Sequence, residues 1–81
     1  MTNPLDDDPM APAERPLLID IHTLASLLDR SAASLERDLP AGRLPAPVWL
    51  GGSRRWRRAE IEAWVDAGCP TQAEWEGLSH E

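Results

Sequence analysis

Apolar residues recur at helical spacing near the start of the chain. Four of them occupy positions i, i+3, i+4 and i+7, one face of an amphipathic helix: Ile21, Leu24, Ala25 and Leu28. Asp20 precedes them and is a suitable N-cap, so the pattern predicts a helix over residues 21–29. The apolar run just before it, residues 17–19, fits either an edge strand or the entry to this helix.

A second helical pattern follows almost at once. Its apolar positions are Ala32, Leu35 and Leu39. Ser31 is a suitable N-cap and Pro40 cannot continue a helix, so we predict a helix over residues 32–39, after which Gly42 turns the chain away. Two short helices with a brief, capped connection are typical of a helix-turn-helix.

The pattern then changes from helical spacing to alternation. Two strand-like runs flank a glycine turn and predict a β-hairpin: Val48-Trp49-Leu50 and Arg54-Arg55-Trp56-Arg57. Because side chains alternate along a strand, a Trp56 that faces the core sends Arg55 and Arg57 outward together.

Two more helices are indicated towards the C-terminus. The apolar residues Ile61, Trp64 and Val65 share a face and predict a helix over residues 59–67, which Gly68 ends. Gln72 to Leu78 fits a short fourth helix, with Trp75 and Leu78 packing back on the domain. The fold class we expect is therefore mainly α with a small β-hairpin, arranged as a winged helix-turn-helix.

Composition divides the 81 residues into one domain and two tails. Residues 1–16 contain four prolines and three consecutive aspartates, so we expect a disordered acidic tail there. Residues 17–68 form the predicted domain, and residues 69–81 a C-terminal tail that includes the short helix.

The formal net charge of −6 argues at first against a nucleic-acid partner. The charge, however, is concentrated at the two ends, since residues 1–16 and residues 69–81 each carry −3. Residues 17–68 are neutral overall, and residues 43–59 hold five arginines and no acid. A DNA-binding surface needs local positive potential rather than a basic total.

The second helix is the candidate for reading DNA in the major groove. Its small and polar residues there are Ser31, Ala33, Ser34 and Arg37. Glu36 and Asp38 would repel phosphates, and we expect them on another side of the helix, facing solvent. The alternative is an ordinary surface helix of a small bundle.

The hairpin is the candidate wing. Its arginines are Arg54, Arg55, Arg57 and Arg58, and Arg43 lies in the same acid-free segment. Such a tip suits the DNA backbone or a minor groove, where arginine is favoured. The alternatives are a charged, solvated strand edge and pairing of Arg57 or Arg58 with Glu60 and Glu62.

Other function classes find little support in the sequence. Cys69 is the single cysteine, which excludes an internal disulfide, and His22 and His80 lack companion ligands, so we expect no metal site and no cofactor. No nucleophile, base and acid set is visible, and we expect no enzymatic activity. With neither a signal peptide nor a membrane-length apolar run, the expected location is the cytoplasm.

The four tryptophans supply most of the large apolar surface. We expect Trp56 and Trp64 in the core and Trp75 as the anchor of the C-terminal tail. Trp49 either covers the domain edge or contacts a partner.

Several motifs together resemble the AlpA-like and excisionase-like group of small helix-turn-helix proteins, which are related to the MerR-type winged helix. The matching segments are Leu24-Ala25-Ser26-Leu27-Leu28, Ser31, Ala41-Gly42-Arg43-Leu44-Pro45-Ala46-Pro47, Leu50-Gly51-Gly52-Ser53-Arg54-Arg55-Trp56-Arg57 and Glu60-Ile61-Glu62-Ala63-Trp64. The resemblance implies a DNA-binding winged helix with the second helix in the major groove and Arg54 and Arg55 on the wing. It also implies either regulation of transcription or control of excision, in which such proteins direct an integrase.

Two hypotheses follow. The first is a protein that binds double-stranded DNA sequence-specifically as a transcriptional regulator or excision factor. Its expected partners beside DNA are an integrase or further copies of the chain on repeated sites. The second is a protein-interaction adaptor on the same fold that does not bind DNA, which the acidic tails favour.

Overall fold

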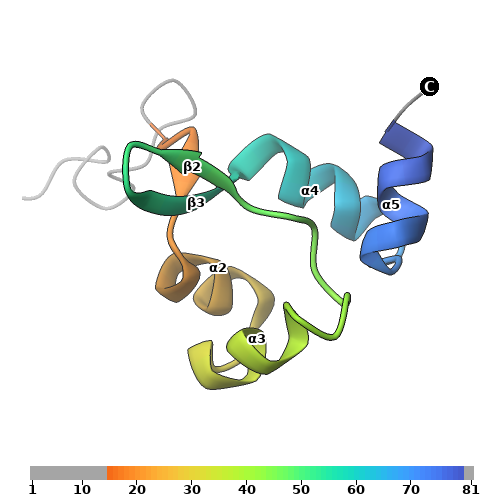
Figure 1. Cartoon of the computed structure of the whole chain (residues 1–81), viewed down its shortest axis with the longest axis horizontal. Helices are drawn as coiled ribbons and strands as arrows, with labels where there is room; N and C mark the ends of the chain where they lie inside the picture. Colours follow the sequence, from red (N-terminus) through yellow and green to blue (C-terminus); the bar gives the residue numbers. More distant parts are fainter. Residues whose placement is uncertain (1–14, 80–81) are drawn as a thin grey trace, which may run out of the picture.

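The computed structural model of the protein describes residues 15–79, which form four helices and a three-stranded antiparallel sheet (Figure 1). In chain order the elements are β1 (Leu18–Ile19), α2 (Ile21–Leu28), α3 (Ala32–Asp38), β2 (Val48–Leu50), β3 (Ser53–Arg57), α4 (Arg58–Asp66) and α5 (Gln72–Ser79). The acidic tail predicted over residues 1–16 lies outside the described residues except for Arg15 and Pro16.

The sheet extends the predicted hairpin by one strand. β3 is central, with β1 and β2 antiparallel on its two sides. Ile19 lies opposite Trp56, which settles the alternatives for residues 17–19 in favour of an edge strand. On the other side Trp49 lies opposite Arg54, and Gly51, with φ 61°, adopts the left-handed conformation that the tight turn requires.

The two predicted helices α2 and α3 are confirmed, and both begin at the predicted caps. The Asp20 carboxylate accepts a hydrogen bond from the Thr23 backbone N–H at 2.9 Å, and the Ser31 hydroxyl accepts one from the Ser34 N–H at 3.1 Å. Between the helices Asp29 takes the left-handed conformation, φ 58°, which lets the chain turn sharply into α3.

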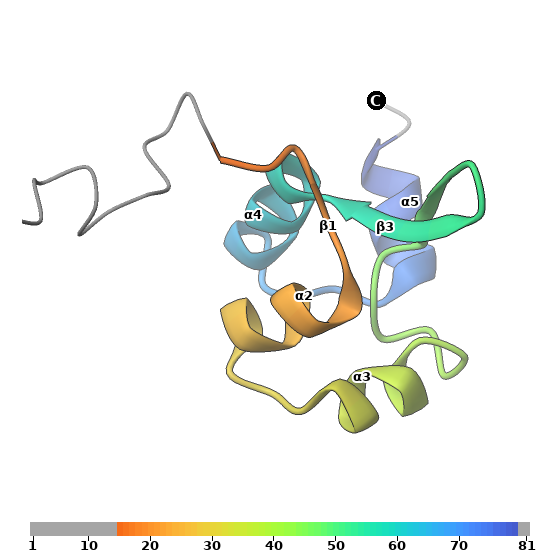
Figure 2. The ribbon, with the colours of Figure 1, turned by 90° about the vertical axis from the view of Figure 1, so that its left-hand side faces the viewer.

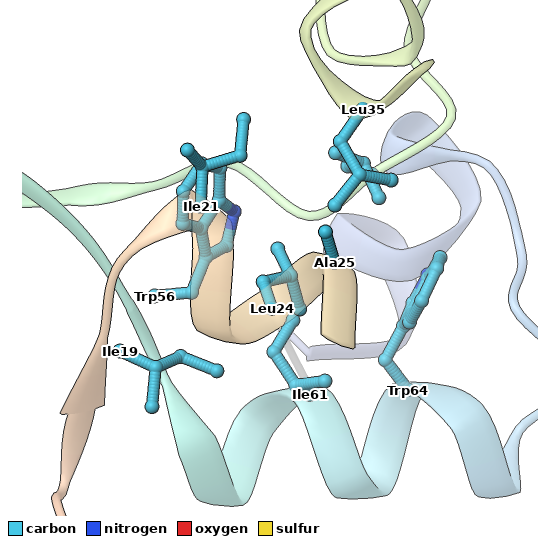
Figure 3. Close-up of a cluster of buried hydrophobic side chains, with 9 residues drawn as sticks. Ile19, Ile21, Leu24, Ala25, Leu35, Trp56, Ile61 and Trp64 are labelled. Atoms are coloured by element: carbon cyan, nitrogen blue, oxygen red, sulfur yellow. The ribbon is translucent and has the colours of Figure 1, made fainter. Parts of the chain in front are cut away.

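One hydrophobic core joins the helices to the sheet (Figure 3). Leu24 of α2, Leu35 of α3 and Trp56 of β3 are almost fully buried, and α4 contributes Ile61 and Trp64. The Trp56 indole N–H donates to the Pro45 carbonyl oxygen at 2.8 Å, so the buried ring keeps a polar partner. The core thereby fixes the hairpin relative to α2 and α3.

The C-terminal helices differ from expectation at two apolar positions. Val65 and Leu78, expected on the buried faces, are 43% and 55% exposed. Ile61 and Trp64 already fill the contact of α4 with the core, which leaves Val65 at the rim of an open groove between α2 and α4. Trp75 does anchor α5, packing on the core and donating its indole N–H to Glu60 at 2.9 Å.

The helices of the described part of the chain are short. No helix within residues 15–79 has the length and the apolar composition needed to cross a membrane.

Candidate nucleic-acid interface

The outer face of α3 carries small side chains and one arginine. Ala33 is exposed, and Ser34 is half-buried and accepts a hydrogen bond at its Oγ from the Ser31 hydroxyl at 2.9 Å. Arg37 donates to the same Ser34 Oγ at 3.3 Å and forms no ion pair with any residue from 15 to 79. The structure thus brings all four predicted α3 residues together, with Arg37 as the cation that an anionic partner can reach.

Asp38 does not face solvent as expected. It is 8% exposed, and its carboxylate lies 3.3 Å from an Arg30 nitrogen and 3.4 Å from an Arg43 nitrogen. The reason is geometric, because Asp38 lies one helical turn after the buried Leu35 and so on the inner side of α3. Arg43, which sequence reasoning placed at the interface, is therefore bonded to the end of α3, although its side chain is 70% exposed.

Glu36 and Arg54 connect α3 to the hairpin. An Arg54 nitrogen lies 2.8 Å from Glu36 Oε2, and the same guanidinium lies 5.3 Å from the centre of the Trp56 ring. The hydrogen bond from Arg54 lowers the pKa of the Glu36 carboxyl below its ordinary value. Glu36 was expected to face solvent away from the DNA face; it is half exposed but bonded to a predicted wing residue.

Arg57 and Arg58 are paired with acids on α4. Arg57 lies 3.5 Å from Glu60, and Arg58 lies 2.8 Å from Glu62 and also donates to the Pro16 carbonyl oxygen. Although residues 43–59 contain no acid, these two arginines find acid partners just beyond that segment. α4 begins directly after β3, so the glutamates fall at helical i+3 and i+4 spacing from the arginines, the alternative that the sequence had left open.

Arg55 lies on the outer face of the sheet, as the alternation predicts. It is half-buried, donates to the Arg54 carbonyl oxygen at 2.8 Å and forms no ion pair with another described residue. The Thr23 backbone N–H lowers the pKa of the Asp20 carboxyl, and the charges of His22 and Arg55 act in the same direction. Arg55 lines the same open groove as Asp20 and Thr23, at the start of α2.

The hairpin apex presents large apolar side chains. Trp49 is 64% and Leu50 is 66% exposed. Because neighbouring side chains in a strand point to opposite faces, Trp49 shares the face of Arg54 and Trp56, and Leu50 lies on the other face. Figure 2 shows the hairpin turn at the upper right, projecting away from α4, with α3 at the bottom of the molecule.

Arg43 lies at the end of α3 and Arg55 in the groove beside α2, and the other arginines predicted at the interface fall into two groups. Arg37, Arg54 and the exposed Trp49 belong to the outer face of α3 and the adjoining face of the hairpin, which we call the α3–hairpin surface. Arg57 and Arg58 belong to the junction with α4. The sequence left open whether Trp49 covers the domain edge or contacts a partner. The strand register, which pairs Trp49 with Arg54, puts it on this surface.

Two other features lie outside this surface. An open groove of about 790 Å³ between α2 and α4 is lined by apolar residues such as Leu27, Ile61 and Val65 and also by charged ones, Arg55 and Arg58 among them. Cys69 is exposed and free, and no three potential metal ligands of the described chain lie together.

The α3–hairpin surface consequently combines small side chains, a capped helix, cations and an exposed indole on adjoining elements, a combination that suits contact with a polyanion.

When the chain is compared with protein-family models, with curated proteins and with solved structures, none of the three comparisons gives a match.

Proposed function

We propose that the chain is a winged helix-turn-helix protein that binds double-stranded DNA, with α3 in the major groove and the β2–β3 hairpin as the wing. The observation that carries this proposal is the outer face of α3. It holds the small side chains of Ala33 and Ser34 beside Arg37, a cation without an acid partner among residues 15–79, and the exposed Glu36 at its edge is bonded to Arg54. Small side chains allow the helix to approach base edges closely, and arginine bonds to guanine or phosphate.

The ion pairs at the surface set the strength of binding. Arg54 reaches a phosphate by exchanging Glu36 for it, and one carboxylate remains close to the DNA. A single module of this size also buries only about 600–1,000 Å² of protein surface on DNA. We therefore propose that useful affinity comes from several copies on repeated sites or from a second DNA-bound protein.

Within this proposal the biological role is transcriptional regulation or control of excision. The two roles differ in the second protein, since an excision factor acts with an integrase. Addition of the chain to a recombination assay with such an integrase separates them: a change in the direction of recombination supports excision, and no change supports regulation.

Selection of binding sites from random duplexes, followed by fluorescence anisotropy, tests the DNA-binding proposal. We expect an enriched sequence and salt-dependent binding of the full chain. The double variant Arg37→Ala/Arg54→Ala should lose about tenfold or more in affinity, from two lost phosphate or base contacts. The matched control is Arg57→Ala, whose arginine is exposed but paired with Glu60. Equal binding by wild type and the double variant would contradict the proposal.

The second candidate is a protein-interaction adaptor, favoured by the pairing of Arg54, Arg57 and Arg58 with glutamates. Those pairs reduce the positive potential at the hairpin. The adaptor predicts no duplex binding even at low salt together with a stable complex with another protein. A titration with duplex at low ionic strength separates the two candidates directly.

A further inference from the structure

Trp49 differs from the other three tryptophans of the chain. The indole N–H groups of Trp56, Trp64 and Trp75 donate to Pro45, Pro70 and Glu60 respectively, at 2.8–2.9 Å. The Trp49 N–H donates to no atom of residues 15–79, and the side chain is 64% exposed.

The fold itself does not require a tryptophan at this position. β2 is an edge strand of the sheet, where polar or charged residues serve pairing and keep the edge soluble. An indole there exposes to water a large apolar area and an N–H without an acceptor among residues 15–79. Both are available to a binding partner.

The position of Trp49 indicates the kind of partner. The residue lies directly across from Arg54, whose guanidinium bonds to Glu36 of α3, so the ring borders the α3–hairpin surface. The adjoining Gly51 and Gly52 carry no side chain, and no heavy atom outside the turn lies within 4 Å of where their Cβ atoms would be. The turn is thus open on its outer side, so its backbone can approach a partner closely.

We propose that Trp49 is the wing's direct DNA contact. Its ring packs against the deoxyribose wall of the minor groove, and its N–H donates to a phosphate oxygen, while Arg54 holds the neighbouring phosphate. This inference rests on the proposed DNA-binding function. It adds an apolar contact to a surface whose other contacts are ionic.

The two kinds of contact differ in their response to salt. Loss of a guanidinium–phosphate contact lowers the dependence of log K on log salt by about one unit, because one fewer counterion is released. Loss of an indole contact lowers affinity and leaves that dependence unchanged. The slope therefore distinguishes Trp49 from the arginines.

The experiment uses the whole 81-residue chain and compares four proteins on a duplex selected by the wild type: wild type, Trp49→Ala, Trp49→Phe and Leu50→Ala. Leu50 is the matched control because it is the next residue, equally exposed, on the opposite face of β2. We expect Trp49→Ala to bind about tenfold more weakly with an unchanged salt slope, Trp49→Phe to lie between it and wild type, and Leu50→Ala to bind within about twofold of wild type.

A second readout does not depend on a substitution that alters affinity. In protein labelled with 5-fluorotryptophan, the ¹⁹F signal absent from Trp49→Phe belongs to Trp49. We expect this signal to shift when duplex is added, and the signals of the three bonded tryptophans to shift far less.

The outcomes are separable. Wild-type affinity in Trp49→Ala with weakened binding in Arg37→Ala would overturn this inference and leave the proposed function standing. Equal losses in Trp49→Ala and Leu50→Ala would also overturn it. Retained DNA binding with altered self-association in Trp49→Ala would assign the indole to a protein contact instead. Absence of binding by the wild type would overturn both proposals.

Discussion

A nitrogen of Arg54 lies 2.8 Å from Glu36 Oε2, and this ion pair joins the β2–β3 hairpin to α3 across 18 positions of sequence. It has two consequences. It helps to fix the angle between the two proposed DNA-contacting elements, and it places one carboxylate on the surface that would meet phosphates.

The first prediction concerns that carboxylate. Glu36→Gln removes a charge that repels phosphate and releases Arg54, so we expect duplex affinity to rise about two- to tenfold at low salt and less at high salt. Fluorescence anisotropy at two ionic strengths measures it. Glu62→Gln is the control, because Glu62 bonds Arg58 at the α4 junction. Weaker binding by Glu36→Gln would show that holding Arg54 in place matters more than the repulsion.

The second prediction concerns acid stability. The pKa values of Glu36 and Asp20 are both lowered in the folded chain, from ordinary values of 4.5 and 3.8. A lowered carboxyl pKa stabilises the fold above the unfolded value, and the stabilisation is lost as pH falls through the folded value. We therefore expect stability to decline below about pH 4.5. Urea denaturation between pH 3 and 6 should show a shallower decline in Glu36→Gln, and parallel curves would refute the prediction.

The third prediction concerns Asp38. Asp38→Asn weakens the bonds from Arg30 and Arg43 while the side chain stays buried, so we expect the free energy of unfolding to fall by about 1–3 kcal/mol. Asp29→Asn is the control, because Asp29 is exposed and asparagine tolerates its left-handed conformation. Unchanged stability in Asp38→Asn would mean that the two ion pairs contribute nothing measurable.

The fourth prediction concerns the start of α3. Ser31→Ala removes the hydroxyl that accepts from the Ser34 N–H, and we expect a loss of about 1 kcal/mol in unfolding free energy. Ser26→Ala, an exposed position within α2, should change stability by less than about 0.5 kcal/mol. Thermal and denaturant unfolding measure both, and equal effects would show that the cap is not the cause.

Local features could be predicted well from the sequence. The bounds of α2 and α3 follow from 3.6-residue spacing and from the caps Asp20 and Ser31, which act within one helical turn. The burial of Trp56 follows from strand alternation. The burial of Asp38 was within reach as well, because it lies three residues after Leu35 on the same side of the helix.

Contacts between distant elements could not be predicted. The bond from Arg54 to Glu36 depends on how the hairpin tilts against α3, and nothing in either segment fixes that angle. The exposure of Val65 and Leu78 depends on where the neighbouring helices end. Helical spacing predicts on which face of a helix a residue lies. It does not predict whether another element of the fold covers that face.

The most direct test of the central claim is an NMR titration of the ¹⁵N-labelled full chain with a selected duplex. We expect the largest backbone shifts on residues 31–37 and on the β2–β3 hairpin, with small changes in α5 and along the α2–α4 groove. Shifts concentrated in that groove, with α3 and the hairpin unaffected at saturating duplex, would contradict the claim.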